Sequence, residues 1–311
     1  GEKESKSNVQ KYTKFTKHSI SGHMKAFQIP VCGTGHGTKC WCNLDPCGLI
    51  CACITWFLIL YAQYAVLRGI LVPWFQWSFI GALIFLLYTA VAVLAIFAHL
   101  KSMLTDPGAV PRNAVSLDPE EPVTEETEND GTNTSRRPRR FCRRCSAYKP
   151  PRAHHCSMCR RCIVKMDHHC PWINNCVGAR NQKFFLQFVG YTFLLCMFSM
   201  VLVVARFSMC VGHADDCGDP AGNFLIIFLI VEAILFGLFT SCMILDQWGA
   251  VQSSVTSIDR LKGEFGNIRS SMGFLEVFGG NDLSSIQLHW FLPIDPEFTP
   301  ELWDSVFMYE E

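Results

Sequence analysis

The chain has 311 residues, of which 50% are hydrophobic, and its 27 basic side chains equal its 27 acidic ones. This balanced charge gives no support for a nucleic-acid partner, so we expect none. Most of the 17 cysteines lie at metal-ligand spacings or inside apolar runs, which favours a reducing compartment over a disulfide-rich secreted protein.

Residues 1–46 are predicted to form a polar arm. Lysines are spread along it, and it shows no apolar stretch of the kind that a cleavable signal peptide contains. The arm leads into a cysteine-rich patch, which comprises Cys32, Cys40, Cys42 and Cys47.

Four apolar runs follow along the chain, at 47–67, 77–98, 184–205 and 224–245. About 20 helical residues suffice to cross a bilayer. One such run could be a buried helix of a soluble protein, but four runs nearly free of charge favour membrane spans. The sequence therefore predicts an all-α integral membrane protein built on a bundle of four transmembrane helices.

The distribution of Lys and Arg sets the expected orientation. The arm carries 7 of these residues, the segment between the second and third spans carries 15, and the tail at 246–311 carries 3. The segment between the first two spans and the loop at 206–223 carry only 1 each. Because basic residues stay on the cytosolic side, the arm, the central segment and the tail should be cytosolic, and the loop at 206–223 should be luminal.

The central segment divides into a linker at 99–140 and a small cysteine-rich module at 141–183. Residues 116–140 have low hydrophobicity and are first acidic and then basic, so we expect them to be disordered. The sequon that begins at Asn133 should carry no glycan on the cytosolic side. The module is too short and polar for a core of its own, so metal ions must hold its turns and small hairpins together.

Seven cysteines lie between Cys142 and Cys176, and the two-residue gaps between several of them suit tetrahedral zinc. Two closed sites need eight ligands, which six cysteines and two histidines supply, so one cysteine is left without a metal. The spacings favour Cys170 as that cysteine. The alternative is that Cys170 is a ligand and Cys176 or another cysteine is spare, and His154 could likewise replace His155.

Cys170 follows the run Asp167-His168-His169. A thiol becomes a good nucleophile when a base takes its proton or its pKa is lowered. In extended chain, His168 shares a face with Cys170 while His169 points the other way, so His168 can serve as the base and His169 as a metal ligand. Asp167 would orient His168, which requires a turn beside it because strict alternation places Asp167 on the other face.

From Cys142 to Phe185 the chain matches C-x2-C-x9-H-C-x2-C-x2-C-x4-D-H-H-C-x5-C-x4-N-x3-F in full, and it resembles the DHHC family of membrane-bound protein S-acyltransferases, or palmitoyltransferases. The likeness covers about residues 47–294. It implies two interleaved, structural zinc sites. Their ligands would be Cys142, Cys145, His155 and Cys162 in the first site, and Cys156, Cys159, His169 and Cys176 in the second.

Flanking motifs extend the resemblance. Asp106-Pro107-Gly108 equals the family's DPG, and Thr256-Ser257-Ile258-Asp259 departs conservatively from its T-T-x-E. The C-terminal motif is matched at Val277-Phe278-Gly279, but Gly273 replaces the usual Asn, which leaves the docking of the tail open. The stretch at 105–111 is most similar to the Golgi-type members and implies an endomembrane, Golgi location.

The resemblance implies protein S-acyltransfer in two steps. Cys170, helped by His168 and Asp167, would take a palmitoyl or stearoyl group from a fatty acyl-coenzyme A and pass it to a cysteine of a membrane-associated protein. Four basic residues of the module could bind the phosphates of the coenzyme, the alternative being a positive surface that faces lipid headgroups: Arg140, Lys149, Arg152 and His154. Two rivals, a zinc finger and a membrane-embedded ubiquitin ligase, fit less well, because the spacing differs from a finger and a ligase leaves Cys170 without a purpose.

Positions in and beside the spans complete the predictions. Leu195 stands at a depth of roughly 17 Å in the third span. Some members of the family carry a bulky aromatic there, so the leucine should leave room in an acyl-chain cavity for eighteen carbons, unless it faces lipid. Glu232, inside the fourth span, is expected to be neutral and hydrogen-bonded to a neighbouring helix. Cys210 and Cys217 could form a luminal disulfide or remain two free thiols.

Overall fold

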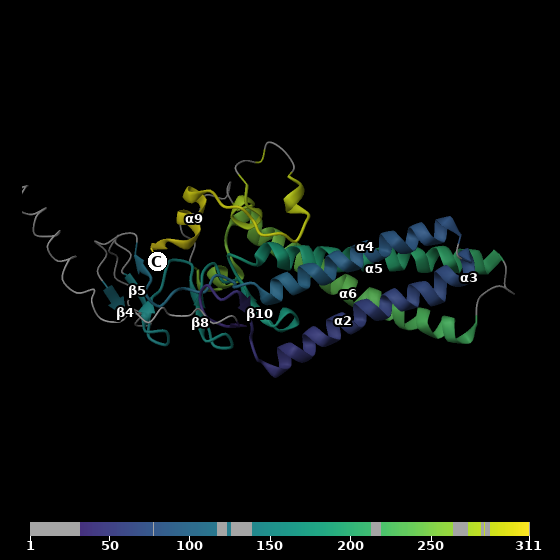
Figure 1. Cartoon of the computed structure of the whole chain (residues 1–311), viewed down its shortest axis with the longest axis horizontal. Helices are drawn as coiled ribbons and strands as arrows, with labels where there is room; N and C mark the ends of the chain where they lie inside the picture. The colour runs from purple at the N-terminus through teal and green to yellow at the C-terminus, as the bar shows by residue number, and fades with distance from the viewer. Residues whose placement is uncertain are drawn as a thin grey trace, which may run out of the picture. The chain divides into compact units, whose positions relative to one another are not determined.

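The computed structural model describes residues 32–76, 78–116, 123–125, 139–212, 219–263, 273–280, 283 and 287–310, which belong to one compact unit. Among these residues, four helical segments are long and apolar enough to cross a membrane: Pro46–Phe75, Phe79–Leu104, Gln182–Val211 and Pro220–Ser253. The first comprises α2 (Pro46–Val66), η1 (Leu67–Leu71) and α3 (Val72–Phe75), and the others are α4 (Phe79–Leu104), α5 (Gln182–Gly212) and α6 (Pro220–Ser253). Helix α4 packs on α5, α5 on α6 and α6 on α2 (Figure 1), which confirms the predicted membrane bundle.

Two of these helices begin at carboxylate caps that are visible in the sequence. The side chain of Asp45 accepts a hydrogen bond from the N–H of Gly48 at 2.8 Å, and that of Asp219 accepts one from Gly222 at 3.2 Å. A proline follows each cap at the first helical position. The caps satisfy amide groups that have no partner inside a helix, so the residues that start both spans are set locally.

The first helix continues past the segment expected at 47–67. Pro73 has no N–H to donate, and the helix widens into the π turn η1 just before it. The chain leaves the helix at Gln76, whose φ is 43°. The extension brings Arg68 to within 2.9 Å of Asp219 at the start of α6.

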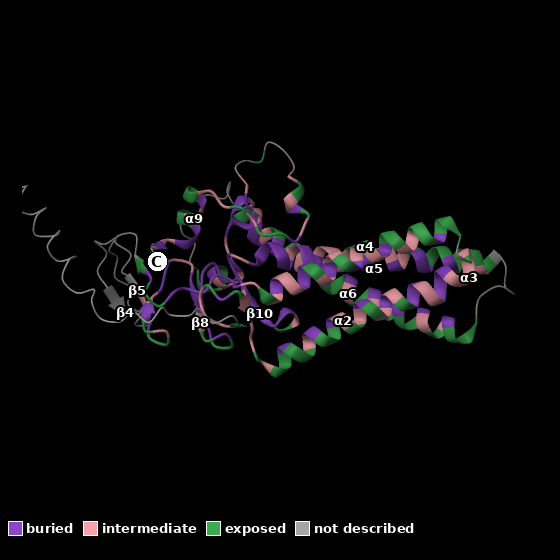
Figure 2. Cartoon of the chain, viewed as in Figure 1, coloured by how far each residue is buried: buried purple, intermediate pink, exposed green. Residues whose placement is uncertain are grey.

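The interior of the bundle contains small side chains together with larger ones such as Tyr88 and Leu229, and large apolar side chains cover its outside. Ala65 and Ala95 are fully buried, whereas Phe57 and Leu238 are exposed. Figure 2 shows exposed residues along the outer faces of the helices, where a soluble protein would not present so much apolar surface. In a bilayer the lipid tails are as apolar as leucine, so close packing of helices through small residues holds the bundle together.

The module between α4 and α5 consists of short antiparallel hairpins, as predicted. Strand β5 (Arg139–Cys142) pairs with β6 (Ala147–Tyr148), β7 (His154–Cys156) with β8 (Arg161–Ile163), and β9 (His168–Cys170) with β10 (Asn175–Val177). The 3-10 turn η2 (Pro171–Ile173) joins the last pair.

Side-chain amides fasten the module to the end of α4. The last carbonyl groups of a helix have no partner inside it. Asn175 donates to the carbonyls of Ser102 and Met103 at 3.0 and 3.2 Å, and Asn181 also donates to Ser102 at 3.0 Å. The two asparagine side chains therefore satisfy carbonyl groups at the end of the second span and attach the module to it.

The Asp106-Pro107-Gly108 motif forms the turn by which the chain leaves α4. Asp106 accepts hydrogen bonds from the N–H groups of Gly108 and Ala109 at 2.9 and 2.7 Å. Gly108 has a φ of 106°, which favours glycine, and its carbonyl accepts from Val164 at 2.8 Å. The motif thus joins the membrane helix to the hairpin β7–β8.

The tail docks directly on the end of α6. A Cβ added to Gly273 would stand 2.0 Å from the carbonyl oxygen of Val251. A side chain at this position would force the two backbones apart, so the departure from the family's Asn fits the contact made here.

The remaining described elements border the bundle and the module. They are β1 (Cys32–Gly33), β2 (Cys40–Trp41), β3 (Val115–Ser116), β4 (Val123–Glu125), α7 (Ser257–Lys262), α8 (Leu275–Phe278), η5 (Leu288–Trp290), α9 (Pro300–Phe307) and β11 (Tyr309–Glu310). Strand β1 pairs with β2, and β3 pairs with β11.

Most of the linker that was expected to be disordered lies outside the described residues, and so does the sequon at Asn133. Within that linker, β4 pairs with β5, so residues 123–125 form a strand rather than irregular chain. Cys210 is disulfide-bonded, whereas Cys217, with which it could pair, lies outside the described residues.

Candidate active site

The structure brings the eight expected metal ligands together in two groups, which are Cys142, Cys145, His155 and Cys162, and Cys156, Cys159, His169 and Cys176. In each group the four ligand atoms lie within 4.8 Å of one another. The Nδ1 atom of His155 lies 3.2 to 3.9 Å from its three sulfurs, and that of His169 lies 3.5 to 3.7 Å from its own. Zinc bonds of about 2.3 Å to sulfur and 2.0–2.1 Å to nitrogen place tetrahedral ligands roughly 3.6 Å apart, so both groups fit the ion.

A shared backbone turn aims the paired cysteines at one point. Ser146 follows Cys145 with a φ of 51°, and Arg160 follows Cys159 with a φ of 55°. Residues other than glycine avoid this left-handed conformation unless the surroundings enforce it. Its recurrence after both cysteine pairs is consistent with turns that are held in place by a bound ion.

Strand β7 separates His154 from His155, which the sequence left as alternatives. Successive side chains of a strand point to opposite faces. His155 therefore joins the first cysteine group, and the Nε2 atom of His154 lies 2.7 Å from Oδ1 of Asp259 instead.

Cys170 belongs to neither group and lies beside a histidine–carboxylate pair in which the carboxylate is buried and the histidine half-buried. The Nδ1 atom of His168 lies 2.7 Å from Oδ2 of Asp167. The expected turn next to this pair is present, because Lys165 has a φ of 48° and the strand begins only at His168. With Nδ1 engaged by the carboxylate, Nε2 is the nitrogen available to a thiol.

Two further groups hold the Asp167 carboxylate in place. Its Oδ2 accepts a hydrogen bond from the side-chain amide of Gln247 at 2.8 Å, and its Oδ1 accepts one from the N–H of Ser257 at 2.7 Å. Burial raises the pKa of Asp167, but the hydrogen bonds from His168 and Ser257 outweigh it and lower the pKa to about 2. The carboxylate is therefore ionised at neutral pH.

The charge on Asp167 acts directly on His168. Burial lowers the pKa of His168, but hydrogen bonds to Asp167 and Cys170 outweigh this and raise it to about 9. The edge of the ring contacts Phe185, with ring centroids 5.4 Å apart, which fixes its orientation. The arrangement places the His168 ring next to the sulfur of Cys170, where a base can take the proton of a reacting thiol.

Cys170 opens into a cavity of about 410 Å³ between the helices, which is within the usual size of a small-molecule site. Its walls come from all four spans and are largely apolar. Leu195 is buried and forms part of this wall, so the third span turns Leu195 toward the cavity and away from lipid.

His99 was not singled out by sequence reasoning, yet it shapes the mouth of the cavity. Its Nδ1 accepts a hydrogen bond from the indole of Trp56 at 3.0 Å, so its Nε2 carries the proton and donates to the carbonyl of Trp172 at 2.8 Å. The ring thereby fixes Trp172, which lines the cavity two residues after Cys170. The predicted span ended at residue 98, just before His99, whereas the helix continues to Leu104.

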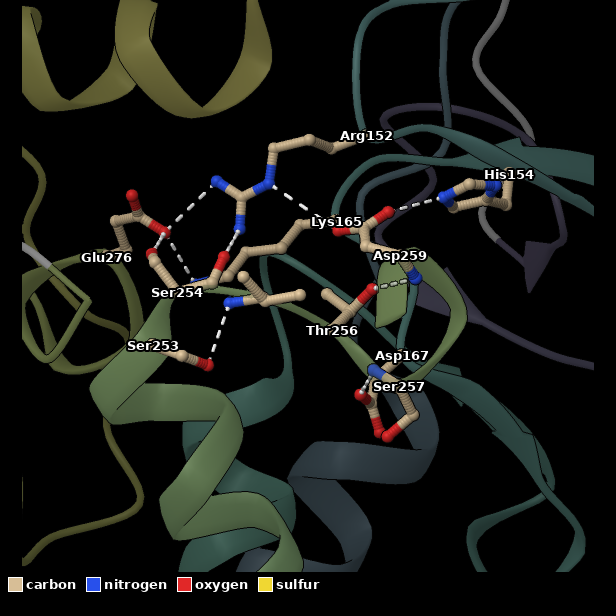
Figure 3. Close-up of polar contacts among 11 residues, drawn as sticks. Arg152, His154, Lys165, Asp167, Ser253, Ser254, Thr256, Ser257, Asp259 and Glu276 are labelled. Atoms are coloured by element: carbon tan, nitrogen blue, oxygen red, sulfur yellow. Dashed lines mark hydrogen bonds and ion pairs between the residues drawn. The ribbon is translucent and has the colours of Figure 1, made fainter. Parts of the chain in front are cut away.

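Two of the four basic residues assigned to coenzyme A are engaged inside the protein (Figure 3). Arg152 lies 3.3 Å from Glu276 and 3.8 Å from Asp259, and His154 is bonded to Asp259. Arg152 and His154, paired in this way, are therefore not part of a positively charged surface that could bind phosphates. Of the other two, the side chain of Lys149 is also buried, and that of Arg140 is half-buried.

Sequence reasoning also missed the supports of the active site that come from the tail and the end of α6. Gln247 contacts Asp167. Ser257 also contacts Asp167, and Glu276 pairs with Lys165 (Figure 3). Glu276 lies 109 to 111 residues from Asp167 and Lys165 along the chain, and no local pattern connects them. The expected hydrogen bond of Glu232 to a neighbouring helix is wrong for Oε2, which is buried without a partner among the described residues.

A thiol kept apart from the metal ligands, beside a charged histidine and at the mouth of an apolar cavity, defines a membrane-embedded enzyme with a cysteine nucleophile. Comparison with known proteins gives the family. The chain belongs to the DHHC palmitoyltransferases, whose family model matches residues 135–264.

Several relatives are similar over most of their length. Palmitoyltransferase ZDHHC7 of Mus musculus is 38% identical over 264 residues, which are 79% of this chain and 80% of the relative. Palmitoyltransferase ZDHHC3 of Homo sapiens is 39% identical over 238 residues, 72% of this chain and 73% of the relative. Probable protein S-acyltransferase 12 of Arabidopsis thaliana is 32% identical over 232 residues, 70% and 75%.

Proposed function

We propose that this chain is a protein-cysteine S-acyltransferase that moves a long-chain acyl group from acyl-coenzyme A to cysteines of membrane-associated proteins. One observation carries the proposal: Cys170 belongs to neither metal-ligand group and faces His168 and an apolar cavity between membrane helices. A long acyl chain needs such a dry space, which the cavity provides next to the nucleophile.

In the first step, the Cys170 thiolate attacks the carbonyl carbon of the acyl-coenzyme A thioester. The bond from that carbon to the coenzyme sulfur breaks, and the departing thiolate takes the proton that His168 holds on Nε2. The products are an acyl-Cys170 thioester and free coenzyme A. Asp167 keeps its bond to Nδ1 throughout and so preserves the orientation of the ring.

In the second step, His168 takes the proton of the incoming substrate thiol. The new thiolate attacks the acyl-Cys170 carbonyl, and Cys170 leaves as the thiolate. Because each step exchanges one thioester for another, placing the reactants correctly accounts for most of the rate.

The Cys142–His155 and Cys156–His169 groups would each hold a zinc ion, which supplies folding energy rather than chemistry because all four positions are filled by protein ligands. We also propose that the module faces the cytosol, in keeping with the basic residues around it, and that the protein resides in the Golgi, as the likeness to ZDHHC3 and ZDHHC7 suggests. Contacts to the coenzyme from Arg152 and His154 would require both side chains to leave buried carboxylates, so we propose no role in coenzyme binding for either.

Incubation of the purified full chain with radiolabelled palmitoyl-coenzyme A tests the proposal. We expect a covalent adduct that hydroxylamine removes, and its absence in Cys170→Ser. Cys242→Ser, which changes an exposed cysteine of α6, is the matched control and should form the adduct normally. A zinc-finger protein or a ubiquitin ligase would form no such adduct, and that result would overturn the proposal.

A further inference from the structure

The cavity next to Cys170 ends in a polar region. Tyr88 and Ser199 line it there, with 2.8 Å between their hydroxyl oxygens. Ser199 donates to the carbonyl of Leu195 at 2.8 Å, so the Tyr88 hydroxyl is the donor to Ser199. Both hydroxyls are therefore satisfied within the protein.

Glu232 also lines the cavity, but unlike the two hydroxyl groups its side chain is not fully hydrogen-bonded. Its Oε2 atom is buried and has no hydrogen-bond partner among the described residues. A buried polar atom without a partner destabilises a protein, and carboxyl groups inside a membrane are rare for the same reason. Because the residue lines the cavity, its carboxyl group is suited to a ligand there that can hydrogen-bond to it.

The packing of α5 against α6 gives the depth of Glu232. A Cβ on Gly237 would stand 3.5 Å from Cβ of Cys196, so these two residues are level with each other. Glu232 is five residues nearer the start of α6, which is roughly 7.5 Å deeper. It therefore lies near the level of Ser199, at the far end of the cavity from Cys170.

The reach of an acyl chain matches this depth. Phe185, which contacts His168, marks the mouth of the cavity, and Ser199 lies 14 residues further along α5, roughly 21 Å at about 1.5 Å per residue. An extended chain of sixteen carbons spans roughly 19 Å, given bonds of about 1.5 Å in staggered geometry. The terminal carbon of such a chain therefore arrives beside Glu232.

We propose that Glu232 is a specificity-determining residue that recognises a hydroxyl group on the last carbon of a sixteen-carbon acyl chain. Such a hydroxyl gives the buried carboxyl the partner that it lacks. An unsubstituted chain of eighteen carbons covers the carboxyl without bonding to it, so Glu232 also disfavours chains that extend past it. The inference rests on the proposed acyltransferase function and adds a substrate class to it.

The experiment compares three donors on the full-length protein in detergent: hexadecanoyl-, 16-hydroxyhexadecanoyl- and octadecanoyl-coenzyme A. Initial rates of adduct formation on Cys170 are measured for the wild type, Glu232→Gln and Glu232→Leu. Leu235→Ala, which changes an exposed residue on the outer face of α6, is the control.

We expect the wild type to use the hydroxylated donor at least as fast as hexadecanoyl-coenzyme A. Glu232→Leu should lower the ratio of hydroxylated to plain donor about tenfold, the usual worth of one hydrogen bond, and should raise the ratio of octadecanoyl to hexadecanoyl. Glu232→Gln keeps a hydrogen-bonding group and should retain use of the hydroxylated donor. Leu235→Ala should leave all ratios unchanged.

Unchanged ratios in a folded Glu232→Leu overturn the inference, and so does a wild type that discriminates against the hydroxylated donor. The second result decides the matter even where Glu232→Leu does not fold. A wild type that forms no adduct with hexadecanoyl-coenzyme A contradicts the proposed function itself, which keeps the two failures apart.

Discussion

The Nζ atom of Lys165 lies 2.9 Å from the Oε2 atom of Glu276, and both side chains are buried. The same oxygen accepts a hydrogen bond from the hydroxyl of Ser254 at 2.6 Å and lies 3.3 Å from Nη1 of Arg152 (Figure 3). One carboxylate of the tail thus holds three groups of the module and of the end of α6. One of them adjoins the active site, since Lys165 is two residues before Asp167.

Replacing Glu276 by Gln should weaken both the docking of the tail and the support of Asp167. The variant leaves the buried ammonium of Lys165 unpaired, a change that typically costs about 3–5 kcal/mol. We expect a lower melting temperature and slower self-acylation with both zinc ions retained. Thermal unfolding, metal analysis and adduct formation measure these effects.

Asp304→Asn, which removes an exposed carboxylate of α9, is the control for that change and should be neutral. The double variant Glu276→Gln with Lys165→Met removes the unpaired charge and should recover part of the stability. A Glu276→Gln protein as stable and active as the control would show that the pair contributes nothing.

The same carboxylate should make stability depend on pH. Burial raises the pKa of Glu276, but the charges of Lys165 and Arg152 outweigh it and hold the pKa below its usual range. Such a group stabilises the fold at a pH above its pKa in the unfolded chain, which is about 4.3. This contribution is lost as the pH falls through the lower pKa of the folded protein. The wild type should therefore lose more stability than Glu276→Gln between about pH 5 and pH 3 in thermal unfolding. Parallel curves would contradict the assignment.

Cys170→Ser should abolish self-acylation and transfer while the protein keeps its fold and both zinc ions. The reason is that Cys170 lies outside both ligand groups. Cys156→Ser should lose metal and cooperative unfolding together, because the energy of a structural zinc is folding energy. Metal analysis separates the two outcomes, and loss of a full zinc equivalent from Cys170→Ser would rule out its assignment as the free thiol.

His168→Ala and His169→Ala should fail for different reasons. The first removes a general base, which typically costs roughly 10²–10⁴-fold in rate, and should keep its zinc. The second removes a ligand of the second group and should lose metal. Adduct formation and zinc content are measured on both proteins, and equal zinc loss would mean that their roles are not separate.

Leu195 should influence the preferred length of the acyl chain, because it is buried in the cavity wall. Its leucine side chain leaves room for eighteen carbons alongside sixteen, and Glu232, deeper in the same cavity, makes the longer chain the slower of the two. Leu195→Tyr narrows the cavity and should favour shorter chains, whereas Leu195→Ala should favour longer ones. Competition between donors of fourteen, sixteen and eighteen carbons checks this, and unchanged preference in both folded variants would exclude Leu195.

The active-site motif was largely predictable from the sequence, because its residues lie close together along the chain. The two-residue gaps paired Cys142 with Cys145 and Cys156 with Cys159, and the resemblance supplied the remaining ligands of each group. The alternation of side chains along β9 separates His168 from His169. The four apolar runs likewise predicted the bundle, since crossing a bilayer requires long helices whose backbone groups are satisfied internally.

Only the tertiary structure decided which side chains face one another across elements. Spacing along a chain does not give the rotation of one helix against the next. The sequence therefore left open whether Leu195 faces the cavity or lipid, and it did not predict the unpartnered oxygen of Glu232. Arg152 and His154 were predicted to bind phosphate because a sequence does not show whether a basic side chain faces solvent or a carboxylate inside the protein. Their buried carboxylate partners, Asp259 and Glu276, come from the tail, and folding alone brings these distant segments together.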